Sequence, residues 1–276
     1  MSTQSYYLPG SIEEATNLLA EKGPDLFVMA GGTLAMPLIN EGLSTPEQVM
    51  GLKKVGLNYL KEVKGQFVIG ATTTLTQMVQ QEEIPILKEA AKAIGGWAIR
   101  NMGTIGGNLF APPPGGDFAV ALLALDAELV LINIQGERII SIGEFYTGFM
   151  MNALLPGEIL TEIRIPIPKG RSAYLKYGRR QENTPSIVTV AINLNFDAGN
   201  VQKARVALNA VGPFPFRARK AEESLIGAPL SDQSIQAAAE LAAEESEPFT
   251  DAIASEWYRQ KMIPVIVKRT FEKIAT

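Results

Sequence analysis

One stretch of this sequence says most about its fold: Arg100-Asn101-Met102-Gly103-Thr104-Ile105-Gly106-Gly107-Asn108, followed by Pro112-Pro113-Pro114-Gly115-Gly116-Asp117. It carries little signal for a regular helix or strand, so the sequence predicts an irregular segment that ends just before Phe118. Ordered loops of this length are uncommon unless they bind something. The stretch therefore predicts a ligand-binding loop.

A second glycine pair lies upstream, in Ala30-Gly31-Gly32-Thr33. It follows a short apolar run, Asp25 to Ala30, that predicts a buried strand, and it precedes a predicted helix from Met36 to Asn40. Glycines carry no side chain, so successive backbone N–H groups can turn toward an anion, and a neighbouring Thr or Asn adds a further donor. Two such loops are suited to hold a diphosphate from opposite sides.

Either glycine pair taken singly is more often an ordinary turn. The sequence also lacks two other glycine-rich motifs that bind phosphate. No Gly-x-x-x-x-Gly-Lys-Ser/Thr sequence occurs, which disfavours a P-loop nucleotide hydrolase. No Gly-x-Gly-x-x-Gly follows a predicted strand, which disfavours a Rossmann dinucleotide site.

Composition excludes several function classes. The 276 residues include no His and no Cys, which removes a Ser-His-Asp triad, histidine metal sites, disulfides and the usual cysteine-ligated zinc or iron–sulfur sites. A net charge of −4 argues against general nucleic-acid binding. Apolar runs such as Ala119 to Leu125 are too short to span a membrane. The N-terminus lacks a secretory signal pattern, so a cytoplasmic location is expected.

The remaining pattern predicts an α+β organisation. A capping box at Ser11 starts a helix that ends at Gly23-Pro24. The other elements expected before a boundary at Pro166 to Gly170 are a strand at Gln66 to Ala71, a helix capped by Thr74, a helix at Ile86 to Ile94, a helix at Ala119 to Leu125, and strands at Glu128 to Ile134 and Ile159 to Ile165. Beyond this boundary, strands are expected at Ala173 to Tyr177, Ile187 to Phe196 and Ala204 to Val211. They are followed by helical sequence through Ala221, at Ile235 to Ala243 and at Ala254 to Ile274.

Several of these motifs together resemble a known family. Ile99 to Leu109, Pro114, Asp117 and Ala121 to Ala127 closely resemble the FAD-binding medium subunit of the molybdenum hydroxylases, the xanthine dehydrogenase and carbon monoxide dehydrogenase family. Ala30 to Thr33 stands where that family has its first pyrophosphate loop. Ser255, Tyr258-Arg259 and Val265 to Arg269 look like the family's closing helix, so the resemblance covers nearly the whole chain.

The resemblance implies a fold and a set of partners. Residues 1–168 would form a two-part FAD-binding module of the vanillyl-alcohol oxidase (PCMH) type, with sub-lobes at about residues 1–55 and 56–168. Residues 169–276 would form a small α+β domain like the C-terminal domain of the carbon monoxide dehydrogenase flavoprotein. The cofactor would be one non-covalent FAD. The molybdenum cofactor and 2Fe-2S clusters would lie on a molybdopterin-binding large subunit and an iron–sulfur small subunit of a hetero-oligomer.

The resemblance also implies site residues, none of them catalytic or metal-binding. The expected cofactor-binding residues are Ala30, Gly31, Gly32, Thr33, Leu34, Ile94, Thr104, Ile105, Gly106, Gly107, Asn108, Asp117, Ile187 and Lys203. Lys203 matches a flavin-proximal lysine of the xanthine dehydrogenase flavin domain, where a positive charge would stabilise the reduced ring. Three of these residues have ordinary structural alternatives: Asp117 as a helix N-cap, Ile94 as a core residue and Lys203 as an exposed strand-end lysine.

Two departures from the family pattern concern the surface offered to the flavin ring. Thr33-Leu34 replaces a frequent His-Ser pair, and Phe110-Ala111-Pro112-Pro113 replaces small polar residues. Phe110 either stacks on the ring or packs its own loop. Tyr177 is a further candidate cover for the ring, with a half-buried strand position as the alternative.

The favoured function is electron transfer: the FAD accepts electrons from iron–sulfur clusters of a partner and passes them to an external acceptor. An autonomous flavin oxidase of the vanillyl-alcohol type is the alternative, disfavoured by the lack of His or Cys for covalent flavin attachment or base catalysis. A ligand-binding or assembly module that has lost flavin is a third reading. The sequence leaves the organic substrate open, and it does not choose among NAD, quinone, oxygen or a protein as acceptor.

Overall fold

The N-terminal lobe is built on a parallel three-stranded sheet, in the computed structural model that describes residues 3–275. Its order is β1-β3-β2, with β1 at Ser5–Tyr7, β3 at Gln48–Gly51 and β2 at Leu26–Met29. Two helices and one 3-10 turn complete it: α1 (Ile12–Lys22), η1 (Gly23–Asp25) and α2 (Ala35–Asn40). The Ser11 side chain accepts a hydrogen bond from the Glu14 N–H, so the predicted cap starts α1.

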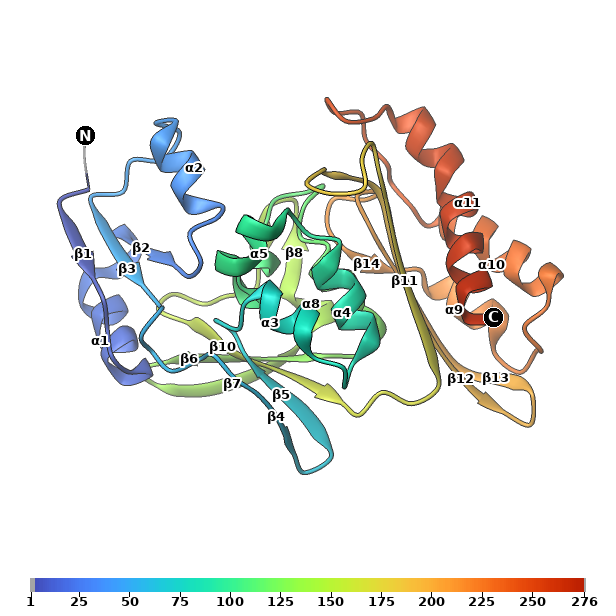
Figure 1. Cartoon of the computed structure of the whole chain (residues 1–276), viewed down its shortest axis with the longest axis horizontal. Helices are drawn as coiled ribbons and strands as arrows, with labels where there is room; N and C mark the ends of the chain where they lie inside the picture. Colours follow the sequence, from blue (N-terminus) through green and yellow to red (C-terminus); the bar gives the residue numbers. More distant parts are fainter. Residues whose placement is uncertain (1–2, 276) are drawn as a thin grey trace.

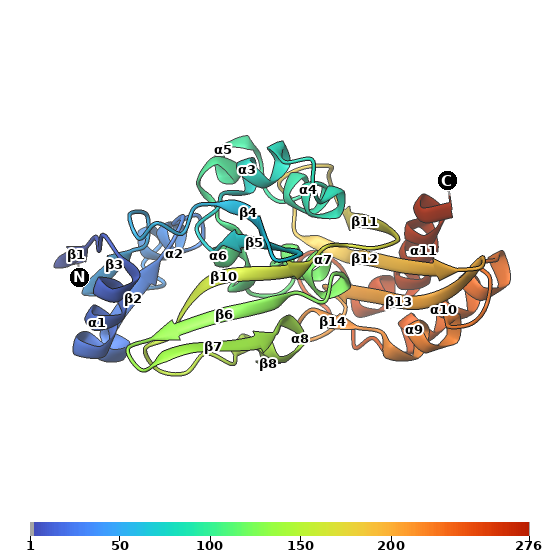
Figure 2. The same ribbon diagram turned by 90° about the horizontal axis from the view of Figure 1, so that it is seen from below.

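The central lobe is an antiparallel five-stranded sheet in the order β4-β5-β10-β6-β7. These strands are β4 (Leu60–Val63), β5 (Gln66–Gly70), β10 (Ile159–Pro166), β6 (Glu128–Asn133) and β7 (Gly136–Ser141). Its helices and a separate hairpin are α3 (Leu75–Gln80), α4 (Pro85–Lys92), α5 (Trp97–Met102), α6 (Ile105–Leu109), α7 (Phe118–Ala124), α8 (Ile142–Phe145), β8 (Tyr146–Gly148) and β9 (Met151–Asn152). Helices α3, α4 and α5 lie on one side of this sheet (Figure 2).

The C-terminal lobe is an antiparallel sheet covered by helices on one face (Figure 1). Its strands are β11 (Arg171–Gly178), β12 (Ser186–Asp197), β13 (Asn200–Asn209) and β14 (Phe216–Arg217). Its helices are α9 (Arg219–Leu225), α10 (Asp232–Glu244) and α11 (Glu256–Ala275). Apolar residues of β12 and β13 share one buried cluster with those of the three helices, which makes this face a hydrophobic core.

Helix α7 joins the central and C-terminal lobes. All seven of its residues are buried, as expected for a helix that is hydrophobic all round. It contacts α4 and α6 of its own lobe and also β12 and β13 of the next. The two ends of α7 therefore lie where the two lobes meet.

The mixed α+β fold expected from sequence is confirmed, but the predicted irregular segment is wrong in part. Residues 97–102 and 105–109 form the short helices α5 and α6, so the irregular part is confined to residues 103–104 and to the residues between α6 and α7. Glycine pairs normally weaken helices. Here the Thr104 cap and the burial of Ile105 and Leu109 offset that cost. Among residues 3–275, no helix is long and apolar enough to cross a membrane.

Candidate functional site

The first glycine loop leaves its backbone donors free. It runs from the end of β2 into α2, and Gly32 has φ +73°, a conformation that favours glycine. Within the described part of the chain, no group accepts a hydrogen bond from the N–H of Gly31, Gly32, Thr33 or Leu34. Leu34 is the N-cap residue of α2 and its side chain makes no capping bond. Four consecutive donors are thus available to a ligand.

The second glycine loop uses its donors inside the protein. The Ile105 N–H donates to the Thr73 carbonyl (2.9 Å) and the Gly106 N–H to the Ala71 carbonyl (2.9 Å). The Gly107 N–H donates to Thr104 Oγ1 (3.0 Å), and the Asn108 N–H to the Thr104 carbonyl (3.0 Å). The interpretation that both loops turn free N–H groups outward is therefore wrong for this loop.

The two loops lie against each other without room for side chains. A Cβ atom at Gly31 would lie 1.9 Å from the Met102 carbonyl oxygen, far inside contact distance. A Cβ at Gly107 would lie 3.8 Å from the Ala30 Cβ, so this glycine faces the first loop. The free N–H groups of the first loop therefore stand beside the bare glycine surface of the second. Such a cradle of backbone donors suits an anionic diphosphate.

Asn108 links the second loop to α7. Its Oδ1 accepts the Phe118 N–H at 3.0 Å, so Asn108 supplies the capping bond that the sequence assigned to Asp117. Asp117 occupies the N-cap position of α7, but its side chain makes no capping bond. The capping alternative for the Asp117 side chain is therefore wrong. The Asn108 amide NH2 donates to no other described residue and remains available to a ligand.

Asp117 is instead the centre of a buried polar cluster between the lobes. Its carboxylate is almost fully buried and accepts hydrogen bonds from Ser186 Oγ (2.8 Å), Thr189 Oγ1 (2.8 Å) and Asn209 Nδ2 (3.1 Å). Lys176 Nζ lies 2.9 Å from Asp117 Oδ2. A buried charge needs such partners, because unpaired it would be strongly disfavoured. No sequence motif pointed to this cluster, because its four partners come from strands far along the chain.

Ile94 and Ile187 take apolar positions near this cluster. Ile94 is half-buried and packs against the central core just after α4. Ile187 is buried on β12, next in sequence to Ser186. The core alternative for Ile94 is thus seen in the structure, and it leaves part of the side chain exposed for a ligand.

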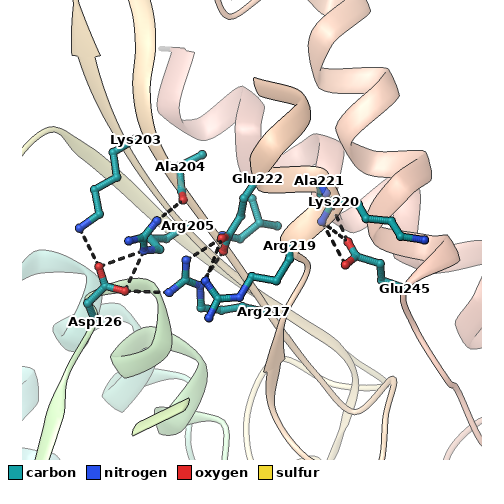
Figure 3. Close-up of polar contacts among 11 residues, drawn as sticks. Asp126, Lys203, Ala204, Arg205, Arg217, Arg219, Lys220, Ala221, Glu222 and Glu245 are labelled. Carbon is teal, nitrogen blue, oxygen red and sulfur yellow. Dashed lines mark hydrogen bonds and ion pairs between the residues drawn. The ribbon is translucent and has the colours of Figure 1, made fainter. Parts of the chain in front are cut away.

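Lys203 lies at the other end of α7, in a different ion cluster. Its Nζ is 2.7 Å from Asp126 Oδ2, and its side chain is 47% exposed. Arg205 Nε and Arg217 Nη1 contact the same carboxylate at 2.7 and 2.8 Å (Figure 3). Burial alone would raise the pKa of Asp126, but hydrogen bonds and charge from Arg205 and Lys203 outweigh it, so the pKa is lowered. The structure does not bring Lys203 to the glycine loops.

The candidate aromatic covers point in different directions. The Tyr177 hydroxyl lies 2.7 Å from the Tyr258 hydroxyl of α11, so its ring is directed toward the helical face of the C-terminal lobe. Phe110 is 45% exposed and packs edge-on against Phe145, with ring centroids 5.5 Å apart. It also borders a hollow of about 80 Å³ together with Tyr146 and Phe214. Phe110 therefore has both a packing contact and a free surface.

Comparisons with known proteins decide the family. Residues 1–168 match the family described as the FAD binding domain in molybdopterin dehydrogenase, and residues 173–274 match the CO dehydrogenase flavoprotein C-terminal domain. The chain belongs to the FAD-binding subunits of the molybdopterin dehydrogenases. Its fold is accordingly the two-part PCMH-type FAD module with its C-terminal domain, and its cofactor is FAD.

The relatives are similar over nearly their whole length. The 6-hydroxypseudooxynicotine dehydrogenase complex subunit alpha of Paenarthrobacter nicotinovorans is 34% identical, over 97% of this chain and 93% of its own. The xanthine dehydrogenase FAD-binding subunit of Escherichia coli O157:H7 is 29% identical, over 98% and 95%. Among solved structures, reconstituted CO dehydrogenase from Oligotropha carboxidovorans superposes with a TM-score of 0.94 at 32% identity, covering 98% of this chain and 96% of that one. The resemblance inferred from the glycine loops is confirmed, as is membership in an oxidoreductase family.

The residues present fit the family's cofactor. A diphosphate needs donors and space, and the first loop offers four free N–H groups beside glycines that tolerate no Cβ. The Thr33 hydroxyl and the Asn108 amide lie on the same two loops. The fit thus rests on the geometry of this chain as well as on its relatives.

Proposed function

We propose that this chain is the electron-transfer subunit of a molybdenum-containing hydroxylase or dehydrogenase. It would accept electrons from iron–sulfur clusters on a small partner subunit and pass them to an external acceptor, while a molybdopterin-binding large subunit oxidises the organic substrate. One observation carries the proposal: free backbone donors on one glycine loop face the bare glycines of another, in a chain with no His or Cys.

The protein's own contribution is binding and tuning. FAD, when bound, supplies the redox chemistry. The N–H groups of Gly31 to Leu34 would donate to the diphosphate, with Ala30 and Gly107 forming the walls of the cradle. Thr104, Ile105 and Gly106 would hold the second loop in place through their hydrogen bonds and burial.

The residues between the lobes would complete the site. Asn108 would donate its free amide to the cofactor, and Ile94 and Ile187 would line it. Asp117 would contribute to cofactor binding from the buried cluster at the start of α7. Lys203 pairs with Asp126 at the far end of that helix, so we propose no direct contact between Lys203 and the flavin. We further propose residue 168 as the end of the FAD-binding domain, and a cytoplasmic location.

The test separates electron transfer from autonomous oxidation. Purified chain is photoreduced, a dye or quinone is added, and reoxidation of the flavin absorption band is followed; we expect rapid reoxidation. Purines, N-heterocycles, aldehydes or carbon monoxide are then added to the oxidised chain alone. We expect no bleaching until molybdenum and iron–sulfur subunits are supplied. Bleaching by any of these compounds without partners would establish the autonomous oxidase instead.

A further inference from the structure

Lys176 is a buried lysine at the junction of the central and C-terminal lobes. It stands on β11, and only 10% of its side chain is exposed. Its Nζ lies 2.9 Å from Asp117 Oδ2 and donates to the Ala93 carbonyl at 3.2 Å. Ala93 ends α4 and immediately precedes Ile94. One ammonium group thus connects β11, the end of α4 and the start of α7.

The carboxylate opposite Lys176 is surrounded by hydrogen-bond donors. Asp117 accepts from two hydroxyls and one amide in addition to the ammonium. The orientation of the Asn209 amide is fixed independently, because its Nδ2 also donates to the Gly115 carbonyl at 2.8 Å. Lys176 is therefore the positive member of a buried ion pair.

The residue after Asp117 connects this pair to the second glycine loop. Asn108 Oδ1 binds the Phe118 N–H, and Phe118 follows Asp117 in the chain. Lys176 has three N–H donors, of which the described residues accept two. One donor of this mostly buried cation therefore remains, next to the Ala93 carbonyl that precedes Ile94.

We propose that Lys176 places the positive charge that faces the flavin ring, with Asp117 as the residue that positions it. The inference rests on the proposed function, because it requires FAD in the cradle. A fixed cation near the ring stabilises the anionic reduced form over the oxidised form and so raises the reduction potential. In a buried site this effect is screened little by solvent.

Lys203 provides the matched comparison. Asp117 precedes α7 and Asp126 follows it, so the seven residues of the helix hold them about 10 Å apart at 1.5 Å per residue. Lys203 is 47% exposed, and the carboxylate it contacts is shared with two arginines. Removal of its charge should hardly change the reduction potential of the flavin.

The test is the reduction potential of the bound FAD, measured on flavin-loaded full-length chain. The variants are Lys176→Met, Asp117→Asn, the double variant, and Lys203→Met as control. At a fixed solution potential, we expect Lys176→Met to lower the ratio of reduced to oxidised flavin at least tenfold. For a two-electron couple this corresponds to a reduction potential lower by about 30 mV. Lys203→Met should match the wild type.

The double variant guards against misfolding, because Lys176→Met alone leaves a buried carboxylate unpaired. Asp117→Asn keeps one side-chain oxygen that can accept from Lys176 and hold it in place, so this variant and the double variant differ in the Lys176 charge. The potential of the double variant should therefore lie below that of Asp117→Asn. Equal potentials in that pair, with flavin content retained, would overturn the proposal alone. A wild-type chain that takes up no FAD would overturn the proposed function and this inference with it.

Discussion

The two glycine loops, Ala-Gly-Gly-Thr and Ile-Gly-Gly-Asn, both contain a Gly-Gly pair, yet their backbone N–H groups have different roles. In the first, the N–H groups of residues 31–34 have no acceptor among the described residues. In the second, four consecutive N–H groups are used to build α6 and to attach it to Thr73 and Ala71. The first loop supplies donors, and the second supplies a rigid wall without side chains.

This difference shows that a glycine pair can be required for two separate physical reasons. Gly32 needs a positive φ, which other residues adopt at a cost. Gly31 needs close approach, because the Met102 carbonyl occupies the space of its missing Cβ. Substitutions in the two loops should therefore separate loss of flavin from loss of stability.

The largest effect is expected from Gly31→Ala. The new methyl group would meet backbone rather than a flexible side chain, so the two loops must move apart, and overpacking of this kind typically costs about 1–3 kcal/mol. We expect a lower melting temperature and almost no bound FAD. The control is Gly143→Ala, whose Cβ would meet only Ser141 Oγ at 3.5 Å. Full flavin content in the Gly31 variant would show that the loops need not touch.

Gly107→Val should reduce flavin binding far more than stability. A side chain here would meet the Thr104 hydroxyl at 2.9 Å and then project toward Ala30, into the proposed diphosphate space. We expect the Kd for FAD to rise at least tenfold, about 1.4 kcal/mol, in titrations of deflavinated chain, with a much smaller change in melting temperature. A soluble variant with unchanged affinity would remove this glycine from the cradle.

Thr104→Ala should act mainly on stability. The Thr104 hydroxyl is the N-cap of α6, and loss of such a cap typically costs about 1 kcal/mol. Denaturant unfolding should show that loss, and Thr104→Ser should restore most of it because serine caps equally well. If alanine and serine behave alike, the cap contributes nothing.

The smallest effect is expected from Thr33→Ala. Thr33 is on the donor loop, its hydroxyl is one donor among several, and a single hydrogen bond is worth about 0.5–1.5 kcal/mol. The Kd for FAD should rise less than about tenfold, and the unfolding free energy should not change. An effect as large as that of Gly107→Val would mean that the side chain, not the backbone, is the main donor of this loop.

The sequence predicted individual helices and strands better than the contacts between them. Periodicity and capping residues such as Ser11 and Thr74 act locally, so their helices could be predicted where they occur. The helix α6 was missed because its cap had to outweigh two glycines. The short strands β1 and β3 were also not predicted, since they pair with each other across about forty residues. Strands β4 and β7 pair with neighbouring strands in hairpins, but they were not predicted because their mostly exposed residues give little apolar pattern.

The same difference between local patterns and long-range contacts explains which site residues could be predicted. Gly31 and Gly107 could be named from the motif and the resemblance, although their different roles depend on hydrogen bonds across the fold. The partners of Asp117 lie 59 to 92 positions away, so no local pattern pointed to the ion pair between Lys176 and Asp117. Lys203, named from the resemblance, contacts Asp126, a pairing that becomes visible only when β13 lies beside the end of α7.

The central claim is most directly tested by the flavin content of the purified full-length chain. The chain is saturated with FAD, freed of excess, and precipitated with acid, and the flavin in supernatant and pellet is quantified by chromatography and mass. We expect one FAD per chain, all of it in the supernatant, because the protein holds it without a covalent bond. A folded chain that retains no flavin, or flavin that stays on the precipitated protein, would contradict it.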